Sequence, residues 1–213
     1  GIADYFDFDC VDIEGQKISI IIMRLYECSL KSFVSKKTIT YEFIKKSFFS
    51  LLKTIDTYNK NGIIHRDIKP ENILVDGNGN LVLSDFGIAY FDSERYELKA
   101  KTENGDRLAN YTFSAPEQFD KNVEPHITMD IYAFGQIIQW LVTEKTHKGT
   151  GRDPIYSFIN EEKIYIYDQV IEKCLRNDAK ERFQSIEEIF SYIEKIEENL
   201  REKDPFDDIN LFN

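Results

Sequence analysis

The side chains with the clearest chemical potential lie in one short segment, residues 65–72, which reads His-Arg-Asp-Ile-Lys-Pro-Glu-Asn. Asp67, Lys69 and Asn72 place a carboxylate, an ammonium and an amide close together along the chain. A second carboxylate, Asp85, begins the sequence Asp-Phe-Gly. Oxygen ligands of this kind suit Mg²⁺, which takes one or two protein groups together with phosphate oxygens. The set therefore favours phosphoryl transfer, a reaction in which the protein mainly positions the reactants and neutralises charge.

A short β hairpin is expected to bring the two carboxylates to one place. Ile73–Val75 and Leu81–Leu83 are apolar runs of strand length, and residues 76–80 between them are rich in Asn and Gly. Asn and Gly accept positive φ, so this segment predicts a tight turn. The first strand follows Asn72 directly and the second leads towards Asp85, so the polar groups should meet at one end of the hairpin.

The rest of the chain is expected to be mainly helical. Apolar side chains recur at helical spacing over residues 44–58 and again over about residues 164–175. Between about residues 129 and 142 they occupy nearly every face, which predicts a buried helix. A last helix is expected over about residues 185–200.

The beginning of the chain predicts a separate pair of strands. Residues 5–11 alternate between apolar and polar side chains, and Glu14-Gly15 predicts a turn. Residues 18–23 are rich in β-branched side chains, which favour a strand. A two-stranded hairpin is marginal in water, so we expect this one to need partners.

Composition narrows the class of protein. Hydrophobic residues make up 42% and charged residues 31%, the balance of a soluble globular protein. Acidic residues outnumber basic ones, 38 to 27, which disfavours binding to nucleic acid. No apolar run approaches the roughly 20 residues that a membrane helix needs. The three cysteines are odd in number and far apart, so we expect reduced thiols in a cytoplasmic protein.

These motifs, in this order, resemble those of the eukaryotic-type protein kinase family. Residues 65–72 meet every defined position of the catalytic-loop pattern His-Arg-Asp-x-Lys-x-x-Asn, and residues 85–87 give Asp-Phe-Gly. The lysine at position 69 is similar to that of the serine/threonine branch. The resemblance extends over residues 22–183 and implies ATP and Mg²⁺ as cofactors and a protein as substrate.

The resemblance also implies a fold and a division of the chain. The fold would be mainly α with short β hairpins, a large C-terminal lobe together with two strands of the small lobe. Residues 1–27 would be the remnant of the small-lobe sheet and the hinge, residues 28–203 the C-terminal lobe and residues 204–213 a loose tail.

The family's catalytic roles carry over to matching positions. Asp67 would orient the substrate hydroxyl and accept its proton, while Lys69 would steady the transferred phosphoryl group. Asn72 and Asp85 would hold Mg²⁺, and Gly87 would allow the turn that points Asp85 inward. The structural and regulatory residues implied are His65, Arg66, Phe86, Gly87, Thr102, Asn110, Glu117, Asp130 and Arg182.

Residues 22–27 resemble the hinge of the family. Met23 would be the gatekeeper, and the backbone of Arg24, Leu25 and Tyr26 would meet the adenine ring. Leu74 would form the floor under the base.

Three further matches concern support of the site. Glu117 closes Ala-Pro-Glu, and Arg182 lies in the late segment whose arginine pairs with that glutamate, so we expect a buried Glu117–Arg182 ion pair. Asp130 begins the family's buried central helix and would support the backbone of the catalytic loop. Arg66 would pair with a phosphate on the activation segment, for which Thr102 is the preferred acceptor.

The sequence departs from the family pattern in two respects. It contains no Gly-x-Gly-x-x-Gly and no Val-Ala-x-Lys, the parts that clamp ATP, so we expect the 213-residue chain alone to transfer phosphate poorly. We interpret it as a fragment that needs the N-terminal lobe or other segments of the same parent chain, rather than a family member without that lobe. In addition, Asn110 stands where many serine/threonine members have Thr.

Two alternatives remain beside a protein kinase. A pseudokinase-like binding module would dock partners without catalysis, although it would have no need for Asp67, Lys69, Asn72 and Asp85 together. A kinase of small molecules usually lacks the lysine after the catalytic Asp and the Ala-Pro-Glu segment, and both are present here.

Overall fold

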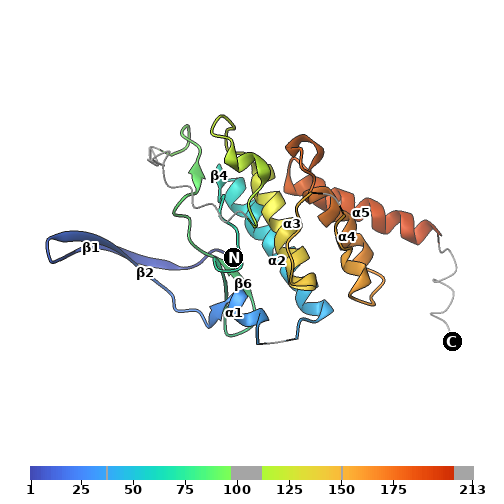
Figure 1. Cartoon of the computed structure of the whole chain (residues 1–213), viewed down its shortest axis with the longest axis horizontal. Coiled ribbons are helices and arrows are strands. Elements are labelled where there is room, and N and C mark those ends of the chain that lie inside the picture. The colour runs from blue at the N-terminus through green and yellow to red at the C-terminus, as the bar shows by residue number, and fades with distance from the viewer. Residues whose placement is uncertain (37, 97–111, 150, 204–213) are drawn as a thin grey trace.

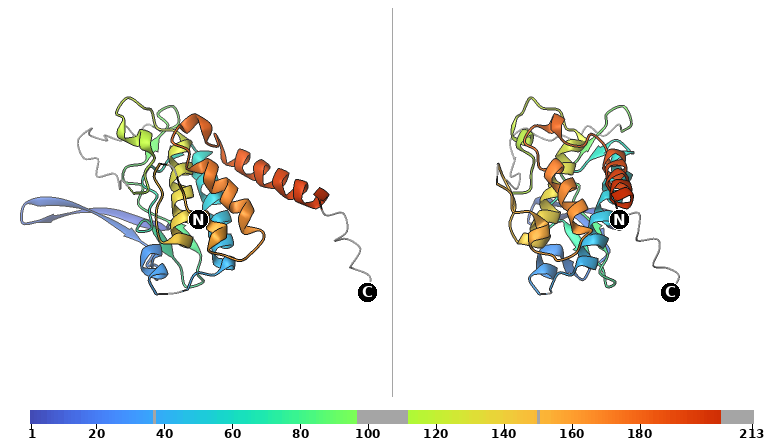
Figure 2. Two further views of the ribbon diagram at one scale, coloured as in Figure 1. Left: turned by 45° about the vertical axis from the view of Figure 1, so that its right-hand side comes forward. Right: turned by 90° about the vertical axis from the view of Figure 1, so that its right-hand side faces the viewer.

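The structure is a computed structural model that describes residues 1–36, 38–96, 112–149 and 151–203 (Figure 1). In the described residues, a body of helices carries two small sheets at one side, and a third sheet, a long strand pair, projects away from it (Figures 1 and 2). Its elements, in order, are β1 (Tyr5–Ile13), β2 (Gln16–Met23), β3 (Cys28–Ser29), α1 (Leu30–Val34), α2 (Tyr41–Asn59), β4 (Ile63–Ile64), β5 (Ile73–Val75), β6 (Leu81–Leu83), β7 (Tyr90–Phe91), the 3₁₀ turn Pro116–Phe119, α3 (Ile127–Thr143), the 3₁₀ turn Ile155–Ser157, α4 (Ile164–Cys174), the 3₁₀ turn Ala179–Glu181 and α5 (Ile186–Lys203).

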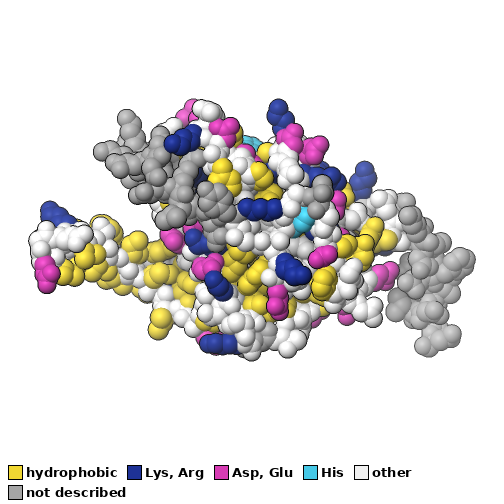
Figure 3. Space-filling model, in the orientation of Figure 1, with side chains coloured by type: hydrophobic (Ala, Val, Ile, Leu, Met, Phe, Trp, Pro, Cys, Tyr) yellow, Lys and Arg dark blue, Asp and Glu magenta, His cyan; other side chains and the backbone are white. Residues whose placement is uncertain are grey.

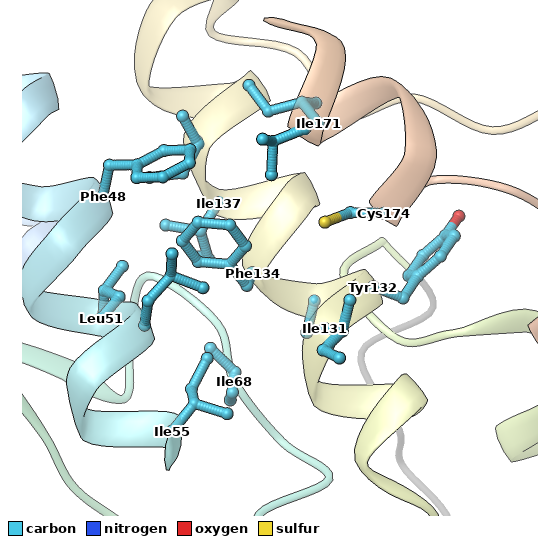
Figure 4. Close-up of a cluster of buried hydrophobic side chains, with 14 of the residues drawn as sticks. Phe48, Leu51, Ile55, Ile68, Ile131, Tyr132, Phe134, Ile137, Ile171 and Cys174 are labelled. Carbon is cyan, nitrogen blue, oxygen red and sulfur yellow. The ribbon is translucent and has the colours of Figure 1, made fainter. Parts of the chain in front are cut away.

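Helix α3 forms the centre of the core, as its apolar composition predicts. Nearly all of its residues are buried, and α2 packs on one side of it and α4 on another (Figure 4). Phe134 of α3 lies edge-to-face with Phe48 of α2, with ring centroids 5.0 Å apart. Gly135 permits the close approach of α4, because a Cβ added there would lie 2.8 Å from the Cβ of Cys174. The core therefore fixes α2, which leads into the polar segment at residues 65–72.

The hairpin expected from the Asn- and Gly-rich turn is present. β5 and β6 pair antiparallel, with Leu74 opposite Val82, and β3 pairs with the other edge of β5. A backbone hydrogen bond from Ser84 N–H to Asn72 O (2.9 Å) closes the open end of this hairpin. Residues just after β6 are thereby held beside residues just before β5.

The strand pair β1–β2 is also confirmed, with antiparallel register from Tyr5 opposite Met23 to Ile13 opposite Gln16. Most of its apolar side chains are exposed, for example Phe6 at 67% and Ile21 at 59%. Figure 3 shows hydrophobic side chains along the length of this projecting pair. Within the described residues it therefore lacks the apolar partners that the sequence predicts it to need.

No helix in the described ranges combines the length and apolar character of a membrane span.

Candidate active site

Lys69 and Asn72 of the catalytic-loop pattern both bond the carboxylate of Asp67. Lys69 Nζ lies 2.6 Å from Asp67 Oδ2, and Asn72 Nδ2 donates to the same oxygen at 2.9 Å. Asn72 Nδ2 also donates to the backbone oxygen of Asp67 at 2.9 Å. Both side chains of the ion pair are largely shielded, with exposed fractions of 21% for Lys69 and 13% for Asp67. The loop thus holds an oriented carboxylate with a cation and an amide fixed against it.

The backbone of this loop is held by Asp130 at the beginning of α3. Its carboxylate accepts hydrogen bonds from His65 N–H and Arg66 N–H, both at 2.8 Å. A third bond, also 2.8 Å, comes from the hydroxyl of Tyr58 on α2, whose pKa burial raises well above the usual value. Burial raises the pKa of Asp130, and these three donors oppose that effect by stabilising the carboxylate. The predicted contact between Asp130 and the loop backbone is therefore present, and it stabilises Arg66 at a positive φ of 68°.

His65 takes a structural position beneath the loop. It is fully buried, its Nε2 bonds Ser84 O at 3.0 Å, and its Nδ1 accepts from Asp67 N–H at 3.2 Å. Nε2 must carry the proton, since the partner there is a carbonyl and Nδ1 is an acceptor. Burial lowers the pKa of His65 from 6.5, which agrees with this neutral form. The ring links the catalytic loop to the end of the β5–β6 hairpin.

This arrangement predicts an acid-sensitive fold. Below about pH 6.5 the unfolded chain protonates His65 and the folded chain does not, so the free energy of unfolding should fall as the pH drops. We expect His65→Gln to reduce this slope, because Gln keeps a donor for Ser84 O but does not titrate. Urea unfolding of both proteins between pH 7.5 and 5 measures how the free energy of unfolding depends on pH. Equal slopes for the two proteins would contradict the assignment of a neutral, buried His65.

The Asp-Phe-Gly segment places its carboxylate outward from the same region. Asp85 is exposed and has a positive φ of 63°, and its Oδ1 accepts from Gly87 N–H at 3.2 Å. Phe86 packs on His65, with ring centroids 4.5 Å apart. The residue of this turn that lies in the left-handed region is Asp85. Gly87 leaves space for the turn, since a Cβ there would lie 3.0 Å from Asp85 Oδ1.

The donor set fits a hard cation. The Nδ2 group of Asn72 is directed to Asp67, which leaves the amide oxygen of Asn72 as the ligand atom. The Ser84–Asn72 backbone bond and the Ser84 Oγ bond to Asn72 O (2.9 Å) keep Asn72 close to the segment that carries Asp85. Asn72 would supply an amide oxygen and Asp85 a carboxylate to Mg²⁺, an ion that also takes phosphate oxygens and water.

The segment that resembles a hinge joins the projecting strands to the lobe. Met23 ends β2, and Leu25 after it is 94% exposed. The Arg24 N–H is used within the strand pair, where it donates to Asp4 O at 2.9 Å, so the polar group that Arg24 could offer a base is its carbonyl. The Tyr26 hydroxyl accepts from Asp4 N–H at 3.0 Å. Leu74 lies opposite Ser29 in the sheet that follows this segment.

The predicted ion pair between Glu117 and Arg182 is present and buried. The two guanidinium nitrogens of Arg182 meet the two Glu117 oxygens at 2.6 and 2.9 Å, and the Arg182 side chain has no exposed surface. Its other donors reach backbone oxygens of Arg176, Asn177 and Thr128 at 2.7–3.0 Å. The guanidinium thus has a partner for each of its five N–H groups.

Sequence reasoning missed several residues that position the site. Gln118 Nε2 donates to Arg66 O at 2.8 Å, which ties the segment after Ala-Pro-Glu to the catalytic loop. Tyr58 appeared only as a core residue of α2, and Ser84 gave no signal beyond strand patterning. A polar contact made by one hydroxyl leaves no periodic trace in a sequence. Thr102 and Asn110 lie outside the described residues.

The helical lobe, the order of its motifs and the cluster of Asp67, Lys69 and Asn72 define a chain of the protein-kinase class. The family described as "Protein kinase domain" matches residues 9–205, and the chain belongs to that family. It is similar to the probable serine/threonine-protein kinase PknB of Lactococcus lactis subsp. lactis, with 30% identity over 205 residues that cover 90% of this chain and 31% of that protein. These similarities place it in the eukaryotic-type serine/threonine branch.

Two other relatives agree in class. Serine/threonine-protein kinase PknD of Protochlamydia amoebophila is 28% identical over 178 residues, 71% of this chain and 18% of that protein. CBL-interacting serine/threonine-protein kinase 15 of Arabidopsis thaliana is 32% identical over 123 residues, 57% of this chain and 28% of that protein. The chain spans less than a third of the length of each of these curated relatives.

Proposed function

We propose that this chain is the catalytic part of an ATP- and Mg²⁺-dependent protein kinase that phosphorylates Ser or Thr hydroxyls. The observation that carries the proposal is the Asp67 carboxylate, which meets Lys69 and Asn72 on one oxygen while Asp130 anchors the loop beneath it. Such an arrangement serves a reaction whose demands are orientation and charge neutralisation.

Each side chain would have a separate task. Asp67 Oδ2 is engaged by Lys69 and Asn72, so Asp67 Oδ1 would orient the substrate hydroxyl and accept its proton. Lys69 would steady the transferred phosphoryl group. Asn72 and Asp85 would hold Mg²⁺, which supplies charge neutralisation for the phosphates of ATP.

The adenine ring would lie against the segment after β2. Met23 would limit the depth of the pocket, the backbone of Arg24, Leu25 and Tyr26 would bond the base, and Leu74 would form its floor. The cysteines in the described part of the chain are free thiols, which favours action in the cytoplasm.

The test is transfer of radiolabelled γ-phosphate from ATP to a mixture of proteins, followed by phosphoamino-acid analysis. We expect the full-length gene product that carries this chain to label Ser and Thr in the presence of Mg²⁺. We expect the 213-residue chain alone to label proteins far more slowly, since its sequence holds no Gly-x-Gly-x-x-Gly and no Val-Ala-x-Lys.

The possible results separate the candidates. Label found on small molecules but on no protein would contradict a protein kinase. No transfer by the full-length protein would favour a pseudokinase-like binding module. Rapid turnover by the 213-residue chain would contradict its dependence on further segments.

A further inference from the structure

The hydroxyl of Tyr5 comes from a distant part of the chain to the backbone of Asp85, the residue that carries the proposed metal-binding carboxylate. Tyr5 begins β1, and its oxygen accepts a hydrogen bond from Asp85 N–H at 2.9 Å. Asp85 occupies the left-handed region at φ 63°, a conformation that costs energy in a residue with a Cβ. The contact therefore falls on the one residue of this segment whose backbone is strained.

A bulge in β1 aims Tyr5 at this position. Tyr5 pairs with Met23 and Asp7 with Ile22, so Phe6 is the extra residue of the ladder. Such bulges redirect a side chain relative to the rest of its strand. Just before β1, Ala3 N–H donates to Leu83 O at 2.8 Å, so the chain is already fixed beside β6 when it reaches Tyr5.

The neighbours of Asp85 have anchors of their own. Ser84 bonds Asn72 through its N–H and its hydroxyl, both at 2.9 Å, and Phe86 lies on the His65 ring. Among the described residues, the contact that fixes the Asp85 peptide N–H is the Tyr5 hydroxyl. The Tyr5 hydroxyl therefore fixes the backbone conformation of Asp85 between Ser84 and Phe86, which have contacts of their own.

We propose that Tyr5 is a positioning residue that holds Asp85 in its left-handed conformation for the metal ion. Tyr5 also pairs with Met23, which ends β2 in the segment that resembles a hinge. It therefore connects that segment to Asp85, the residue that carries the metal-binding carboxylate. This inference rests on the proposed function, in which Asp85 holds Mg²⁺. It adds a residue from β1, outside both motifs, to the determinants of metal affinity.

Tyr5→Phe removes the hydroxyl and keeps the ring. In the full-length protein, hydrogen exchange of the Asp85 amide reports the bond directly, and electron paramagnetic resonance of Mn²⁺ with a non-hydrolysable ATP analogue reports the metal site. We expect Tyr5→Phe to speed Asp85 exchange and to weaken Mn²⁺ binding by about threefold, the low end for one hydrogen bond because Tyr5 and Asp85 are exposed. Tyr192→Phe is the matched control, since it loses a hydroxyl bond to Gln169 (3.3 Å) far along the chain on α5.

Asp85→Asn separates failure of the inference from failure of the function. If Asp85→Asn loses Mn²⁺ binding while Tyr5→Phe matches the unaltered chain in affinity and in Asp85 exchange, the role of Tyr5 is overturned and the metal site stands. If Asp85→Asn binds Mn²⁺ as the unaltered chain does, the proposed metal site itself is wrong. Rapid exchange of Asp85 in the unaltered chain would overturn the Tyr5 bond without any variant.

Discussion

The substitution Asp67→Asn is expected to lower the kcat of phosphoryl transfer by the full-length protein by about 10²–10⁴-fold, the usual contribution of a positioned general base. The amide is close in shape, so the loop should keep its fold, yet it has neither the charge that pairs with Lys69 nor the basicity to take a proton. The KM for ATP should change little, because Asp67 is assigned to the acceptor hydroxyl and not to the nucleotide.

A steady-state assay with ATP and peptide substrate measures both parameters. Asp56→Asn is a matched control, since Asp56 lies on α2 and pairs with Lys60 at 2.7 Å at the surface. We expect that variant to keep the activity of the unaltered protein. A loss confined to the KM for ATP in Asp67→Asn would contradict the role given to Asp67.

Much of the lobe was predictable because its signals are local and redundant. The helical spacing over residues 44–58 predicted α2, and the Asn- and Gly-rich residues 76–80 predicted the β5–β6 turn. The contact of Asp130 with the loop backbone and the Glu117–Arg182 pair followed from motif resemblance. Each of these features depends on the residue types at a few defined positions, and those types can be read directly from the sequence.

The parts that escaped prediction depend on single contacts across the fold. The alternation in residues 5–11 predicted a strand but not the bulge at Phe6, because a bulge changes the ladder and not the composition. Consequently, nothing in the sequence predicted the hydrogen bond between the Tyr5 hydroxyl and the Asp85 N–H. The left-handed backbone at Asp85 likewise left no sign in the sequence, because motif resemblance implied only that Gly87 allows the turn.

The substitution Arg182→Met is expected to lower the free energy of unfolding by about 3–5 kcal/mol, the cost of removing one partner from a buried ion pair. It leaves the Glu117 carboxylate without its cation and three backbone oxygens without their donor. Folded domains are stable by only about 5–15 kcal/mol, so this loss is a large part of the total. Urea unfolding of the 213-residue chain measures it.

The control for Arg182 is a pair at the surface. Lys31 and Glu71 lie 2.7 Å apart with exposed fractions of 64% and 40%, and Lys31→Met should cost less than about 1 kcal/mol. Glu117→Gln combined with Arg182→Met should cost less than the sum of the single changes, because the double variant buries no unpaired charge. Equal losses for Arg182→Met and Lys31→Met would contradict the role of the Glu117–Arg182 pair.

The same ion pair also supports the catalytic loop, because Gln118 lies next to Glu117 and bonds Arg66 O. Loss of the pair should therefore loosen the loop, so Arg182→Met should lower both stability and catalysis.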